Sequence, residues 1–123
     1  MKLRIKGNSI RLRLLKSEVE KFANEGFISD ETNFGASTLR YTLRMSNGSD
    51  AIEGKFDANE IAVLIPEQVA RDWTANSSVG FEIEQQINAD ERLTIIVEKD
   101  FVCIDRHDDP DRDDAYPNPN LNC

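Results

Sequence analysis

The chain has 123 residues, a mass of 14.0 kDa, a formal net charge of −8 and a sequence pI of about 4.6. This length supports one domain with one hydrophobic core. The acidic balance argues against a nucleic-acid partner, because nucleic-acid-binding proteins are usually basic. No apolar run is long enough to span a bilayer, and the opening segment alternates charged and apolar residues, unlike a signal peptide. We therefore expect a cytoplasmic protein without a membrane partner.

Charge is distributed unevenly along the chain. Residues 1–44 carry a net charge of +4, residues 45–99 carry −7 and residues 100–123 carry −5. Two interpretations are open. The asymmetry either reflects chance placement on solvated faces or marks a bipolar site, in which one side binds an anion and the other binds a cation.

The first clear element is an amphipathic strand, because Ile10, Leu12 and Leu14 alternate with arginines. A short helix is expected next, beginning with a capping-box pattern at Ser17 and ending at Gly26. Further strands follow over residues 39–43 and 52–56. Residues 2–6 either extend the first strand across a turn at residues 7–8 or form a short strand of their own.

The second half of the chain repeats this pattern. The apolar residues of the first strand reappear 51 residues later at 61–65, and a helix beginning at Pro66 has Trp73 in the place of Phe22. After the helices the offset becomes 54 residues. The repeated unit is therefore predicted to be strand–helix–three strands, with copies over residues 1–56 and 57–104. Chance similarity between two α+β halves is the alternative.

The predicted fold class is α+β. Two copies of the unit give eight strands and two short helices, and their short connections favour antiparallel pairing. Eight such strands form either a closed antiparallel barrel or a strongly curved sheet. The single domain is expected to span residues 1–104, followed over residues 105–123 by an irregular acidic tail rich in Asp, Pro and Asn.

Charged residues occupy alternate positions on several predicted strands. In an open sheet they would form a solvated face, whereas in a wide barrel they would line the interior. Arginine presents a planar fork to phosphate oxygens, and paired carboxylates bind a hard divalent cation. The candidate anion-binding residues are Lys6, Arg11, Arg13, Arg40 and Arg44, and the candidate metal-binding residues are Glu82, Glu84 and Glu98.

The duplicated unit with alternating Arg and Glu strands resembles the CYTH-like superfamily of triphosphate tunnel enzymes and thiamine triphosphatases. The resemblance covers about residues 1–104. It implies an eight-stranded antiparallel barrel whose channel binds triphosphate and a divalent metal. The opening Glu-x-Glu-x-Lys motif of that family falls on Lys2–Lys6, where only Lys6 matches, and Glu82–Glu84 supplies a Glu-x-Glu pair elsewhere. The chain is thus similar to a divergent bacterial member of the superfamily.

The tail contains both cysteines and the only histidine of the chain. Cys103, His107 and Cys123, with an aspartate, would supply a zinc site. A Cys103–Cys123 disulfide and two free thiols are the alternatives. If the tail folded over the basic first half, its aspartates would occupy the anion site. This contact would be either autoinhibition or structural ion pairing.

Three functions follow from these observations. A non-catalytic binding or interaction module with a charged interior is preferred, because the opening motif is incomplete. A divalent-metal-dependent phosphate-binding protein or phosphohydrolase, using a metal-activated water, is the second. A metal or thiol role of the tail is the third. The expected partner is a phosphorylated small molecule, and the expected cofactor is either none or Mg²⁺ or another divalent cation. No catalytic residue is assigned.

Overall fold

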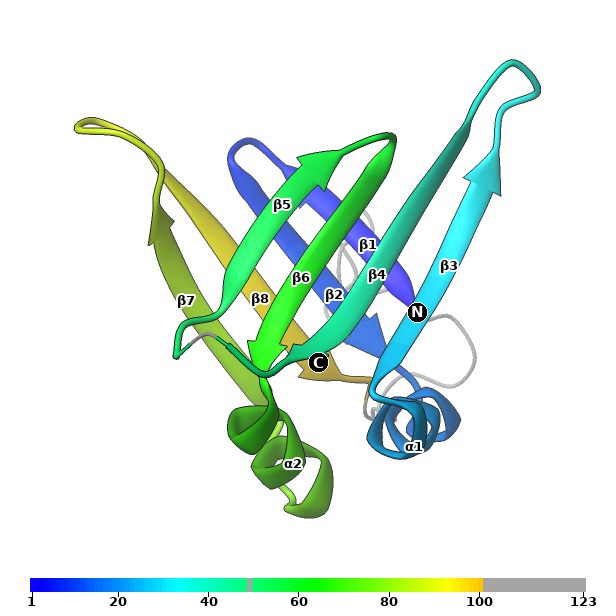
Figure 1. Ribbon diagram of the computed structural model, residues 1–123, viewed down its shortest axis with the longest axis vertical. Coiled ribbons are helices and arrows are strands. Elements are labelled where there is room, and N and C mark those ends of the chain that lie inside the picture. Colours follow the sequence, from blue (N-terminus) through cyan, green and yellow to red (C-terminus); the bar gives the residue numbers. More distant parts are fainter. Residues whose placement is uncertain (49, 101–123) are drawn as a thin grey trace, which may run out of the picture.

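The computed structural model describes residues 1–48 and 50–100, which form eight strands and two helices (Figure 1). The number of strands agrees with the prediction, but residues 2–6 supply one of the eight, and the strand predicted at residues 101–104 lies outside the described residues. Neither helix in these residues is long and apolar enough to cross a membrane. In chain order the elements are β1 (Lys2–Lys6), β2 (Ser9–Leu14), α1 (Lys16–Glu25), β3 (Phe27–Asn33), β4 (Thr38–Ser46), β5 (Glu53–Asp57), β6 (Glu60–Pro66), α2 (Glu67–Ala75), β7 (Gly80–Gln86) and β8 (Arg92–Lys99).

The strands form two separate four-stranded sheets. Sheet A has the order β1-β2-β8-β7, and sheet B has the order β3-β4-β6-β5. In each sheet the central pair is parallel, β2 with β8 and β4 with β6, while the outer pairs are antiparallel. The predicted closed antiparallel barrel is therefore wrong, although the α+β class is confirmed.

The connection after β4 explains the parallel pairing in sheet B. The chain leaves β4 at Ser46 and enters β5 at Glu53, so the link passes over the position beside β4 and places β5 at the sheet edge. A tight turn at Ala58-Asn59 then returns the chain as β6, between β4 and β5. Both turn residues have positive φ, 50° and 64°, as a two-residue hairpin turn requires. A strand that skips a position in this way makes its successor parallel.

The order of the elements repeats once, but the second copy begins earlier than predicted, at β5 instead of at residue 57. The repeated unit is hairpin–helix–hairpin, β1-β2-α1-β3-β4 followed by β5-β6-α2-β7-β8. Residues 2–6 form their own strand, and β5 opens the second copy instead of closing the first. Each sheet contains one hairpin from each copy, so neither copy forms a complete sheet by itself. The predicted division at residue 56 is therefore displaced.

The space between the sheets is filled by apolar side chains. The inward positions of the four central strands include Leu12, Leu43, Val63 and Ile95, all at most 1% exposed and members of one hydrophobic cluster. Because strand residues alternate between faces, the charged residues at the intervening positions point to the outer faces of the sheets. The predicted charged interior is thus wrong, because an interior of unpaired charges costs far more free energy than an apolar one.

Both helices lie at the same end of the two sheets (Figure 1). Phe22 of α1 and Trp73 of α2 are buried, and their rings meet edge to face with centroids 6.2 Å apart. Trp73 contacts Phe81 of β7 in the same way at 5.8 Å. The prediction that Phe22 and Trp73 are equivalent in the repeat agrees with this pairing. Helix α1 begins one residue earlier than predicted, with the Glu18 carboxylate accepting the N–H of Leu15 at 2.8 Å.

Side chains bridge the two seams between the edge strands of the sheets. At one seam the Gln85 amide accepts the N–H of Gly54 at 2.6 Å and donates to its carbonyl at 3.2 Å, so it replaces a strand partner. At the other seam the amino-terminal ammonium binds Glu18 and Asp30. Burial acts to lower the pKa of this ammonium, but its hydrogen bonds to Glu18 and Asp30 outweigh that effect and raise the pKa above 8.0.

Candidate anion-binding site

Five cationic residues lie together on the outer face of strands β1 and β2. The strand register places Lys2 opposite Arg13 and Arg4 opposite Arg11, while Lys6 occupies the next outward position of β1. The alternate residues Leu3 and Leu12 face the core. The basic face, as we call this surface, consists of Lys2, Arg4, Lys6, Arg11 and Arg13.

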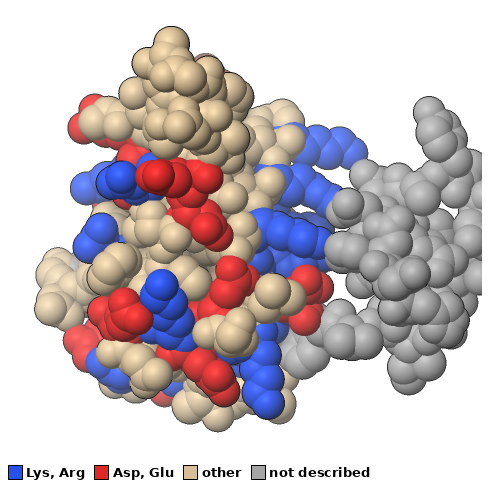
Figure 2. Space-filling view, turned by 90° about the vertical axis from the view of Figure 1, so that its right-hand side faces the viewer, with Lys and Arg blue, Asp and Glu red and all other residues tan. Residues whose placement is uncertain are grey.

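This arrangement is electrostatically unfavourable by itself. Like charges directly opposite one another on neighbouring strands destabilise a sheet, and the basic face contains two such pairs, Lys2 with Arg13 and Arg4 with Arg11. Lys2, Arg4 and Lys6 form no ion pair with another described residue. Figure 2 shows Lys and Arg side chains gathered along the right-hand side of the view. Counted over the part of the chain that the structure describes, the surface therefore has a surplus of positive charge, which favours an anionic ligand.

Glu98 of β8 is the acidic neighbour of the basic face. Its Oε1 accepts hydrogen bonds from Arg13 Nε at 3.0 Å and Arg13 Nη2 at 2.7 Å. Arg11 Nε lies 3.7 Å from the same oxygen, which is too long for a hydrogen bond. This nitrogen is buried and has no hydrogen-bond partner among residues 1–48 and 50–100. The Arg11 side chain as a whole is 33% exposed, so the rest of its guanidinium can contact an anion on the outer face.

A hollow of about 350 Å³ adjoins the basic face at the edge of β1. The phenol of Tyr41 lines it beside the arginines. Burial raises the pKa of Tyr41 above 10.0, and the charges of Asp30 and Glu18 raise it further. The phenol is therefore protonated at neutral pH and can donate a hydrogen bond to an oxyanion. The complete lining is Met1, Lys2, Leu3, Arg4, Arg11, Arg13 and Tyr41.

The predicted metal-binding glutamates lie on the same outer face but do not converge. Glu82 stands opposite Ile96 and Glu84 opposite Thr94 on the β7–β8 ladder, while Glu98 is opposite Gly80. Glu84 has Arg92 at 3.9 Å, and Glu98 is bound to Arg13. Within residues 1–48 and 50–100, no three acidic, cysteine or histidine side chains group as metal ligands. Across sheet A the outer face nonetheless changes from basic on β1 and β2 to acidic on β7.

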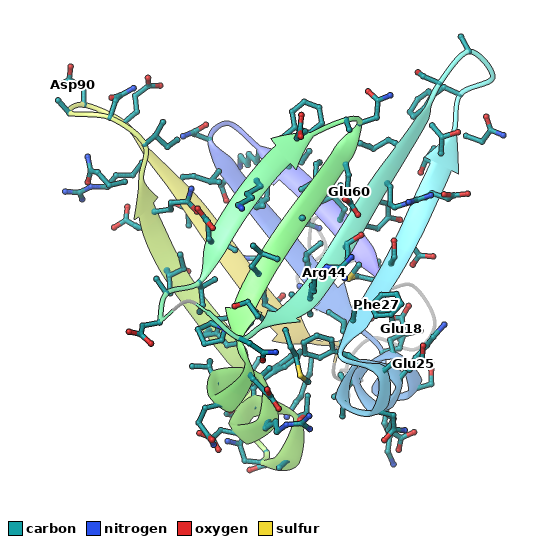
Figure 3. All side chains as sticks on the ribbon, in the orientation of Figure 1. Glu18, Glu25, Phe27, Arg44, Glu60 and Asp90 are labelled. Carbon is teal, nitrogen blue, oxygen red and sulfur yellow. The ribbon has the colours of Figure 1, made fainter. Side chains whose placement is uncertain are left out.

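The other predicted anion-binding residues lie on the opposite side of the molecule. Arg40 and Arg44 occupy the outer face of sheet B, so the predicted set is divided between two surfaces. Arg40 pairs with Glu31 at 3.2 Å, and the Arg44 guanidinium lies over the Phe27 ring, 5.4 Å from its centroid (Figure 3). Both arginines therefore already have partners within their own sheet.

A polar hollow of about 430 Å³ contains these two arginines. Inside it, the Thr42 hydroxyl donates to Glu60 at 2.6 Å and lies 3.0 Å from the Ser29 hydroxyl. Thr42 is only 1% exposed, and its hydrogen bonds satisfy it. Three carboxylates outnumber the two arginines in its lining, so this hollow is a weaker anion site than the basic face.

Lys2, Arg4 and Tyr41 were not among the candidate residues predicted from the sequence. The alternation of Lys2, Arg4 and Lys6 was a usable signal, because it marks one strand face with three cations. Tyr41 had no such signal, since it comes from the other sheet. The tail candidates Cys103, His107 and Cys123 lie outside the described residues.

The fold and the basic face define a class of small α+β protein. It is built from a duplicated hairpin–helix–hairpin unit and carries one strongly cationic sheet surface. The chain belongs to a family of unknown function, DUF7009, which matches residues 1–120. Comparisons with curated proteins and with solved structures find no match.

Proposed function

We propose that the protein is a non-catalytic binding module that holds a phosphorylated small molecule on the basic face. The observation that carries this proposal is the pair of opposed like charges, Lys2 with Arg13 and Arg4 with Arg11, beside one carboxylate, Glu98. An anion between the two strands relieves this repulsion. It also binds the exposed part of the Arg11 guanidinium, whose side chain is 33% exposed. Arginine forks suit phosphate oxygens because they bind them bidentately.

The non-catalytic part of the proposal rests on the carboxylates. A metal-dependent phosphohydrolase needs acidic ligands that converge on the metal beside the phosphate. Glu82 and Glu84 project from β7, two strands away from β2, and Glu98 is held by Arg13. The acidic side of sheet A therefore limits where an anion binds and does not assist its hydrolysis.

We also propose that the chain is a divergent relative of the CYTH-like superfamily. The duplicated arrangement of eight strands and two helices supports this proposal. The channel and metal chemistry of that superfamily are not transferred to this chain, because Lys2 and Arg4 stand where the motif has glutamates and the space between the sheets is apolar.

Binding of tripolyphosphate, measured by calorimetry with and without Mg²⁺, tests the proposed function. The full chain should bind it in both conditions, and ligand at 100 times its Kd should stabilise the fold by about 2.7 kcal/mol. The double variant Arg4→Ala with Arg11→Ala should lose binding. The matched variant Arg40→Ala with Arg44→Ala, which removes two arginines from sheet B, should keep it. Equal losses in both variants, or release of inorganic phosphate with Mg²⁺, would contradict the proposal.

A further inference from the structure

The chain continues beyond the described residues with a strongly acidic segment. Residues 101–123 contain six aspartates and two arginines, a net charge of −4. All six aspartates fall within residues 105–114, in the run DRHDDPDRDD. The charge of this run is opposite to that of the basic face.

The described chain ends close to the basic face. Strand β8 runs parallel to β2, with Glu98 beside Arg13, and the N–H of Asp100 donates to the Leu14 carbonyl at 2.8 Å. The β1–β2 register places Lys2 opposite Arg13. Because neighbouring strands lie about 4.8 Å apart, the chain leaves sheet A roughly 10 Å from β1. Five extended residues span roughly 17 Å. The chain from Asp100 to Asp105 is therefore long enough for Asp105 to contact the basic face.

We propose that the acidic run of residues 105–114 docks on the basic face of the same chain and occupies the anion site when no ligand is bound. Aspartate carboxylates present the same paired oxygens to arginine as phosphate does. Only residues 101–104 separate the run from the described chain, so its effective concentration at the basic face is in the millimolar range, which compensates for weak individual contacts. Docking itself does not require the proposed function. Only its consequence, competition with a phosphorylated ligand, depends on that function.

The effect of the tail on the apparent Kd of a ligand follows from the fraction of time that the run occupies the basic face. If the run occupies the face nine-tenths of the time, the apparent Kd of a ligand rises about tenfold. The proposed contacts are ionic, so added salt weakens them, with a Debye length of about 8 Å at physiological ionic strength. The tail therefore acts as a reversible competitor.

The first test compares tripolyphosphate binding by two full-length variants at low salt. The tail-neutralised variant replaces six aspartates by asparagine, at Asp105, Asp108, Asp109, Asp111, Asp113 and Asp114. The control variant makes the same change of charge on exposed acids elsewhere, at Glu20, Glu25, Asp50, Asp57, Asp72 and Asp90. The tail-neutralised variant should bind about tenfold more tightly than the control. Equal Kd values in the two variants would refute the competition.

The second test detects docking without any ligand. A zero-length carbodiimide reagent, followed by mass spectrometry, should join Lys2 and Lys6 to aspartates of residues 105–114, and the products should disappear in 1 M NaCl. Cross-links from the tail mainly to Lys16, Lys21 or Lys55 would refute the docking site. Cross-links between isotopically distinct copies would refute the intramolecular arrangement. If tripolyphosphate binds neither variant while the expected cross-links form, the proposed function fails and the docking stands.

Discussion

Replacing Glu98 by glutamine should lower stability and raise anion affinity at the same time. Two hydrogen bonds join Arg13 to Glu98, and the side chains are 15% and 18% exposed. Hydrogen bonds to charged groups contribute about 1.5–3 kcal/mol. Glutamine keeps an acceptor oxygen, so we expect the free energy of unfolding to fall by about 1–2 kcal/mol, which lowers Tm by roughly 4–8 °C.

The gain in affinity follows from the strand spacing. An anion centred over the β1–β2 pair lies one and a half strand spacings from β8, or roughly 7 Å from the Glu98 position. Two unit charges at that distance repel each other by about 0.6 kcal/mol in water and about 2.4 kcal/mol at an effective dielectric constant of 20. Removing the carboxylate charge should therefore tighten tripolyphosphate binding by roughly 3- to 50-fold.

Thermal melts without ligand measure the first effect, and calorimetry with tripolyphosphate measures the second. The binding experiment uses the tail-neutralised background, because extra positive charge would also strengthen docking of the tail. Glu31→Gln is the matched control, since Glu31 and Arg40 are both more than half exposed and pair at 3.2 Å on sheet B. Its stability should change by at most about 0.5 kcal/mol, with unchanged affinity. A Glu98→Gln protein that loses stability but binds the anion no more tightly would refute the assignment of the site.

Three further predictions concern the fold. Ala58→Gly should stabilise the protein by about 0.5–1 kcal/mol in urea denaturation, because Ala58 has φ of 50° and glycine adopts that conformation without strain; a loss of stability would mean that the turn is not strained. Gly80→Ala should lower the free energy of unfolding by about 3 kcal/mol or more, since its Cβ would lie 2.0 Å from a carbonyl oxygen of β8. Gly48→Ala is the control and should be tolerated, because there is open space around Gly48. The pKa of the amino-terminal ammonium is raised above 8.0, so its contribution to stability is complete below pH 8 and is lost as the pH rises through the raised pKa. Tm should therefore fall above pH 8, and the double variant Glu18→Gln with Asp30→Asn should show a smaller fall. Parallel curves of Tm against pH for the two proteins would contradict this prediction.

Much of the candidate site could be predicted from alternation alone. Arg11 and Arg13 were placed on one strand face, opposite the apolar Leu12, because successive strand residues point to opposite sides. Their separation from Arg40 and Arg44 could not be predicted, because it depends on which sheet each strand joins. The error in the repeat had a similar origin. A constant offset identifies equivalent residues, but it does not show whether β5 closes one unit or opens the next.

The sequence by itself determined the secondary structure and the polarity of each strand face, because both depend on residues that are neighbours along the chain. Only the tertiary structure decided which face is inside. Each sheet combines one hairpin from each half of the chain, and the two sheets bring the apolar faces of the four hairpins together. Burial of those faces leaves the cations on the outer surface. The strand partners are distant in sequence, so the local residue pattern does not predict whether two neighbouring strands are parallel or antiparallel. Packing of the whole chain determines the direction of pairing.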